Sequence, residues 1–241
     1  MVKGDAFIIS KILRTNQMEQ VLIISHVFAG VTSLLTGIMA SFFGRKGGNL
    51  HRQVGKVYFW CMFWVFVSAM LIISFVRFSH FLMAIAVFSF YLAFSGYRAL
   101  KIKKTRKVEL IDWSAGIITF LFGLGMIGMG INYLIPSEFS SVIGYLCLFF
   151  GFFTSRKSWG NLQMYRKSAT AEKMWWWFAH MSSMSGSLIA ATTAFLVQNG
   201  EIFNVPNQFG WILWVLPTFV GFPFVSYWAR KYKTQFKTRA V

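Results

Sequence analysis

The sequence predicts an all-α, polytopic membrane protein with seven transmembrane helices, on evidence from composition and from pattern. Of the 241 residues, 56% are hydrophobic and only 13% are charged, whereas a soluble domain carries about 25% charged residues. The charges lie in short tracts between long apolar runs, and a run of about 20 apolar residues crosses a bilayer as a helix. A transmembrane β-barrel would show short alternating segments instead, and the sequence has none.

The apolar windows predict the bounds of the spans and of two flanking segments. The predicted spans are residues 20–43, 55–76, 79–98, 110–134, 140–155, 174–197 and 209–229. The fifth is short, and we expect its helix to continue past Arg156 as a cytoplasmic extension. Residues 20–229 thus form one transmembrane domain. Residues 1–19 lack a small-residue cleavage site, so an interfacial segment is expected there rather than a signal peptide. Residues 230–241 are predicted to be a basic cytoplasmic tail.

Basic residues alternate between the connections, and this alternation predicts the orientation. The first, third and fifth connections and the C-terminal tail carry four, six, five and five Lys or Arg residues, which is 20 of the 24 in the chain. The second connection offers only Arg77, and the fourth and sixth offer none. Cytoplasmic loops carry an excess of Lys and Arg. The N-terminus is therefore expected outside and the C-terminus in the cytoplasm.

The remaining composition excludes two classes of function. The net charge of +17 comes mostly from residues at span ends, so we expect a lipid bilayer as the partner and not nucleic acid. Cys61 and Cys147 both fall inside apolar spans, which argues against a disulfide framework and a thiolate metal site. Three consecutive tryptophans, Trp175, Trp176 and Trp177, begin the sixth predicted span. Tryptophan rings are enriched at the membrane–water interface, so this position agrees with a span end.

Titratable side chains inside the predicted spans are the candidate functional groups, because such groups are costly in lipid and usually face the bundle interior. His26 and His180 each share a helical face with small residues, and Asp112 enters the fourth span at its cytoplasmic end. His51 and His80 stand at the starts of the second and third spans. By depth, the histidines form an outer pair, His26 and His80, and an inner pair, His51 and His180, with Asp112 near the inner pair.

Three hypotheses account for these groups. In the first, each pair of imidazoles holds one haem, since neutral imidazole is a good axial ligand. In the second, the inner histidines and Asp112 bind a metal ion or relay protons, because imidazole titrates near neutrality and carboxylate contacts orient it. In the third, the same groups form hydrogen bonds that hold the helices together. The sequence leaves the three open.

Two stretches carry a resemblance to a known family. One contains His26, Gly30 and the run HRQVGKVY from His51 to Tyr58; the other is the run HMSSMSGSLIAATTAF that begins at His180. Together they resemble the family of predicted bacterial membrane proteins known as DUF2306, over the first two spans and the sixth. The resemblance implies a bacterial inner (plasma) membrane location and matches His26, His51 and His180, but not His80 or Asp112. It implies no activity, because none is established for the family.

We therefore predict a membrane redox protein that binds haem b or a divalent metal. The predicted cofactor-binding residues are His26, His51 and His180, and the predicted metal ligands are His51, His180 and Asp112. One alternative is a proton-coupled small-molecule transporter or permease that uses His180 and Asp112. Another is a non-catalytic membrane sensor or assembly protein. No Ser/His/Asp or Cys/His catalytic order is legible, and the catalytic residues of an enzyme stay unassigned.

Overall fold

The described residues form a bundle of antiparallel helices. The computed structural model describes residues 17–43, 45–76, 78–136, 138, 140–167 and 174–238. Its elements are α2 (Gln17–Phe42), α3 (Asn49–Phe75), α4 (His80–Thr105), α5 (Leu110–Leu134), α6 (Val142–Arg166), α7 (Trp175–Gln198), the short 3-10 helix η1 (Asn207–Phe209) and α8 (Ile212–Thr238). The prediction of an all-helical fold is thus confirmed for these residues. Residues 1–16 of the predicted interfacial segment lie outside the described residues.

Five helices are long and apolar enough to cross a membrane: α2, α3, α4, α5 and α8. Their 18-residue windows have a mean hydropathy between 1.5 and 2.1. This agrees with an integral membrane protein. Helices α6 and α7 have 25 and 24 residues, which at about 1.5 Å per residue is close to the length of the others.

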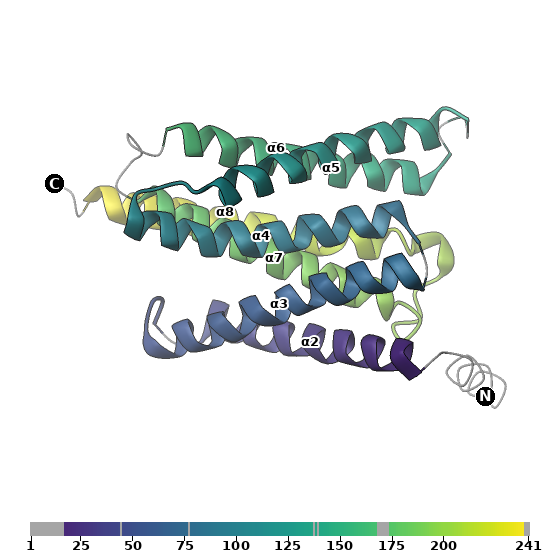
Figure 1. Ribbon diagram of the computed structural model, residues 1–241, viewed down its shortest axis with the longest axis horizontal. Coiled ribbons are helices and arrows are strands. Elements are labelled where there is room, and N and C mark those ends of the chain that lie inside the picture. The colour runs from purple at the N-terminus through teal and green to yellow at the C-terminus, as the bar shows by residue number, and fades with distance from the viewer. Residues whose placement is uncertain are drawn as a thin grey trace.

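Consecutive helices run in opposite directions, so alternate connections gather at opposite ends (Figure 1). The α5 and α6 pair lies along one side of the bundle, α2 and α3 lie along the other, and α4, α7 and α8 lie between them (Figure 1). The basic connections α2–α3 and α4–α5 lie at the same end (Figure 1). The bundle therefore has one end rich in basic residues.

Glycines on one face of α5 and on one face of α6 bring the two backbones together. A methyl group added at Gly151 would lie 2.9 Å from the Gly123 carbonyl oxygen and 2.9 Å from the Ile127 backbone nitrogen. One added at Gly130 would lie 2.9 Å from the Gly144 carbonyl oxygen. Small residues at such spacing allow transmembrane helices to pack closely without a hydrophobic driving force.

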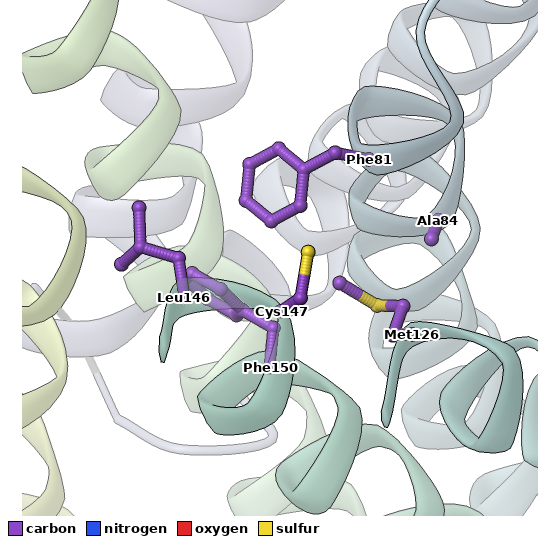
Figure 2. Packing of buried hydrophobic residues seen from close by; sticks show 6 residues of the cluster. All are labelled: Phe81, Ala84, Met126, Leu146, Cys147 and Phe150. Carbon is purple, nitrogen blue, oxygen red and sulfur yellow. The ribbon is translucent and has the colours of Figure 1, made fainter. Parts of the chain in front are cut away.

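A hydrophobic cluster joins this helical pair to the middle of the bundle. It contains Phe81 and Ala84 of α4, Met126 of α5, and Leu146, Cys147 and Phe150 of α6. In Figure 2 the Cys147 sulfur lies between the Phe81 ring and Met126. Trp214 of α8 contacts the cluster, with its ring centroid 5.1 Å from that of Phe81. Cys147 is fully buried in this cluster, as an apolar position rather than a reactive one.

The helices extend beyond the predicted spans mainly at the basic end. Helix α3 begins at Asn49, α4 continues to Thr105 and α6 continues to Arg166, so the expected extension past Arg156 is helical. Helix α8 runs through Pro217 and Pro223 without interruption and includes residues 230–238 of the predicted tail. The prolines therefore do not break the seventh predicted span.

Candidate histidine site

The structure brings His51 of α3 and His180 of α7 together at the basic end of the bundle. Their ring centroids are 6.2 Å apart and their planes make an angle of 75°. The His51 Nδ1 atom lies 3.0 Å from the carbonyl oxygen of Ala40 in α2. The His180 Nδ1 atom lies 3.0 Å from the carbonyl oxygen of Gly96 in α4. Four helices thus meet at one pair of imidazoles that the sequence separates widely.

These two contacts define the tautomer of each ring. A carbonyl oxygen only accepts hydrogen bonds, so each Nδ1 must carry a proton and donate it. In a neutral imidazole, the other nitrogen, Nε2, then holds a lone pair. Histidines that ligate metals nearly always donate their second ring N–H to a carbonyl, a carboxylate or water, which orients the ring and raises its basicity. Both His51 and His180 have this arrangement.

Local sequence explains why the two acceptors are in place. Gly96 allows α4 and α7 to approach, since a methyl group there would lie 3.0 Å from Met184 Cγ and 3.2 Å from Ser183 Cβ. Ala40 lies in the last turn of α2, where carbonyl groups lack helical partners. The Lys46 ammonium also donates to the Ala40 oxygen, at 2.9 Å, and to the Ser41 oxygen. Burial lowers the pKa of Lys46 from its usual value.

Two pairs of buried hydroxyl groups lie along α7 beyond His180. The Ser95 hydroxyl donates to the Ser183 hydroxyl at 3.3 Å, and the Tyr58 hydroxyl donates to Ser187 at 2.8 Å. All four side chains are buried. They join α3 and α4 to α7, the helix that carries His180. Ser183 and Ser187 are among the small residues that share a helical face with His180, but the sequence does not indicate their partners.

We expect Tyr58→Phe to destabilise the protein by about 1 kcal/mol, the usual value of one hydrogen bond. The change removes the donor to Ser187 and leaves the ring, so it tests the contact between α3 and α7 beside the histidines. The thermal midpoint of detergent-purified protein measures the effect. Tyr227→Phe is the control, because Tyr227 is 60% exposed. Equal midpoints for the two variants would contradict the buried Tyr58–Ser187 contact.

Asp112 lies in a different polar cluster. Its Oδ1 accepts from Arg98 Nε at 2.5 Å and its Oδ2 accepts from Arg98 Nη2 at 2.6 Å. Its Oδ2 also accepts from the Glu109 backbone N–H at 2.9 Å, as one half of a capping box that begins α5. Asp112 is 0% exposed. The carboxylate is therefore occupied by Arg98 and by the helix terminus, and the structure does not bring it to the histidine pair.

The outer histidines do not form a pair like the inner one. His26 Nδ1 lies 2.8 Å from the hydroxyl of Ser68, which is fully buried on α3. The His80 ring packs edge-on against Phe78, with the centroids 4.6 Å apart. None of the contacts described for His26 and His80 joins them. The predicted cofactor residue His26 is thus separate from His51 and His180.

The donor set at the inner pair consists of two imidazoles. Among the described residues, no group of three or more His, Cys, Asp and Glu side chains could hold a metal ion. The predicted three-ligand set of His51, His180 and Asp112 is accordingly not assembled there. The sequence interpretation missed the role of Arg98, because Arg98 was counted among the six basic residues of the third connection. Arg98 lies shortly before the connection between α4 and α5, and Asp112 lies shortly after it. These opposite charges on the two sides of a short connection were the signal from which the pair could have been predicted.

Comparison with known proteins adds no relative. No family model, no curated protein and no solved structure matches this chain.

Proposed function

We propose that this integral membrane protein binds a haem through the Nε2 atoms of His51 and His180 and transfers electrons at the membrane. The observation that carries the proposal is the pair itself: two imidazoles 6.2 Å apart, each with Nδ1 held by a backbone carbonyl. Helices α3 and α7 supply the ligands, and α2 and α4 supply the carbonyls that orient them. The cofactor role of His26 has no such support.

The number of ligands favours haem iron over a free ion. A structural zinc site needs four protein ligands and a catalytic one needs three. Haem iron needs only axial ligands from the protein, and two histidines complete its coordination. The His51 and His180 rings lie 6.2 Å apart, and each has Nδ1 engaged by a backbone carbonyl. Their Nε2 atoms would therefore be the two nitrogen donors to a bound haem.

The chain's own residues would hold the ligands in position and set their basicity. The Ala40 and Gly96 carbonyls keep each Nδ1 protonated, so that each Nε2 stays available as a donor. The Lys46 ammonium shares the Ala40 carbonyl with His51 and places a positive charge near the ligand. Haem, when bound, supplies the one-electron chemistry.

We also propose that all seven helices span the membrane, with the N-terminus outside and the C-terminus in the cytoplasm. The support is that α6 and α7 lie side by side with the apolar helices (Figure 1) and that the basic connections share one end. By the positive-inside rule this end faces the cytoplasm, and the histidine pair lies near it. A bacterial inner membrane and membership of DUF2306 stay predictions from the quoted motifs.

Haem content of histidine variants tests the site. We expect detergent-purified protein, produced with ample haem, to contain one haem per chain. His51→Ala and His180→Ala should each lower this content at least tenfold, because each removes an axial ligand. His80→Ala is the matched control, since His80 is exposed and contacts Phe78, and it should keep the haem. Elution as folded protein in size-exclusion chromatography checks that the variants are intact.

Two outcomes would contradict the proposal. Retention of haem by both His51→Ala and His180→Ala would show that the ligands lie elsewhere. Stoichiometric metal without porphyrin absorbance would contradict haem and leave a two-histidine ion site. The alternative of a proton-coupled transporter has no specific support, because Asp112 is buried and bound by Arg98.

A further inference from the structure

A groove between α2 and α3 opens on the outer surface of the bundle. Its volume is about 570 Å³, within the range of about 300–1,000 Å³ that is usual for ligand sites. The lining residues are Ser25, Phe28 and Ala29 of α2, and Lys56, Val57, Trp60, Cys61 and Trp64 of α3. Apart from Ser25 and Lys56 these are apolar or aromatic. The groove thus presents a mostly apolar wall with a single charged residue.

The α3 wall is a continuous stripe along one helix face. Lys56, Trp60 and Trp64 follow each other at intervals of four residues, so the wall extends for about 12 Å at about 1.5 Å per residue. Trp60 is 64% exposed and Trp64 is 42% exposed, so both indoles leave much of their surface uncovered. Trp64 Nε1 donates to the Ser25 hydroxyl at 3.3 Å, at the end of the α3 wall farthest from Lys56.

Lys56 gives the groove a charge at one end only. It is exposed, and the ion pairs described in the structure involve Arg98 and Lys101 instead. It lies on the side of the groove nearer to the α2–α3 connection, where Arg52 precedes it by one helical turn. A lysine on a flexible stem extends its ammonium toward headgroups while its methylene groups stay on apolar surface. The charge and the apolar wall therefore match the two parts of a phospholipid.

We infer that this groove binds one anionic phospholipid, with an acyl chain along Trp60, Cys61 and Trp64 and with the headgroup phosphate at Lys56. The inference is independent of the histidine centre. A basic residue near the membrane surface favours anionic over zwitterionic lipid, whereas the apolar wall accepts either. Selectivity between headgroups is thus assigned to Lys56, and affinity for the chain is assigned to the aromatic wall.

Native mass spectrometry of purified protein with defined lipids tests the inference. Phosphatidylglycerol and phosphatidylcholine with identical acyl chains are added in equal amounts to the detergent-solubilised chain. We expect the first to be retained preferentially, and Lys56→Gln to reduce that preference about fivefold. Lys104→Gln is the control: it removes an exposed lysine of α4 that does not line the groove, and it should leave the preference unchanged.

The two cysteines provide a second readout. Cys61 is partly exposed in the groove, and Cys147 is buried, so a maleimide should label only Cys61 in the folded protein. Excess phosphatidylglycerol should slow this labelling several-fold in the wild type and less in Lys56→Gln. Equal retention of both lipids, or labelling that lipid does not slow, would overturn the inference. A doubled mass with Cys61 protected at high protein concentration would assign the groove to a second copy of the chain and would also overturn it.

Discussion

Gly151→Ala is expected to destabilise the protein by about 2 kcal/mol or more and to separate α5 from α6. The added methyl group would lie 2.9 Å from the Gly123 carbonyl oxygen and from the Ile127 backbone nitrogen. Neither atom belongs to a flexible side chain, so one whole helix must move. Overpacking costs about 1–3 kcal/mol even where side chains adjust. The thermal midpoint in detergent measures the loss.

Gly125→Ala is the matched control for this change. Gly125 lies on the same helical pair, and a methyl group added there meets nothing within 4 Å. Both substitutions replace helical Gly by Ala, so they share the same gain of up to about 1 kcal/mol in helix propensity. The difference between them isolates the helix contact. Equal midpoints would contradict the close approach of α5 and α6.

Arg98→Ala is expected to destabilise the protein by about 3–5 kcal/mol, the usual cost of breaking a buried ion pair. Arg98 is 4% exposed and Asp112 is 0% exposed, so removal of the guanidinium leaves a carboxylate charge without its partner in the interior. The loss should appear as a lower thermal midpoint and as reduced yield of folded protein.

A neighbouring exposed pair provides the contrast. Lys101 Nζ lies 3.3 Å from Glu109 Oε1, and both side chains are more than 40% exposed. Exposed ion pairs contribute little because solvent and salt screen them, so Lys101→Ala should have little effect. The Lys101 ammonium holds the pKa of Glu109 below its usual value, with Arg98 adding to it. This contribution is therefore present above the normal pKa of a glutamate and is lost as the pH falls through the lowered value.

The double variant Arg98→Met with Asp112→Asn distinguishes lost charge pairing from lost packing. Asparagine still offers an oxygen to the Glu109 N–H, so the start of α5 keeps its cap. We expect the double variant to be more stable than Arg98→Ala, because no uncompensated charge stays buried. A double variant as unstable as the single one would contradict an electrostatic role for the pair.

Hydropathy identified the helices where they are apolar and missed their polar extensions. The fourth span, 110–134, coincides with α5, because apolar residues occupy nearly its whole length. Helix α3 begins six residues before the predicted span at 55, since four of the six residues 49–54 are polar or basic and lower the hydropathy of this helix end. The same cause explains why α4 passes residue 98 and α8 passes residue 229. Polar and basic residues at these positions therefore do not end a helix.

From the sequence alone, the candidate site residues could be compared only by their depth along the helices. This comparison placed His51 and His180 at one level, but their contact depends on α3 and α7 being neighbours. That arrangement is set by tertiary packing at positions such as Gly96, whose closeness to Met184 no spacing rule reveals. Asp112 shared the same depth and belongs to another cluster. Equal depth is thus necessary for a common site and does not establish one.

The absorbance spectrum of the haem-loaded protein, oxidised and then reduced, with and without carbon monoxide, tests the central claim most directly. An iron held by both His51 and His180 has no open axial position. We therefore expect the Soret and α bands of six-coordinate, low-spin haem, and carbon monoxide should leave the reduced spectrum unchanged. Absence of a Soret band after loading, or a reduced spectrum that shifts at once on addition of carbon monoxide, would contradict ligation by the two histidines.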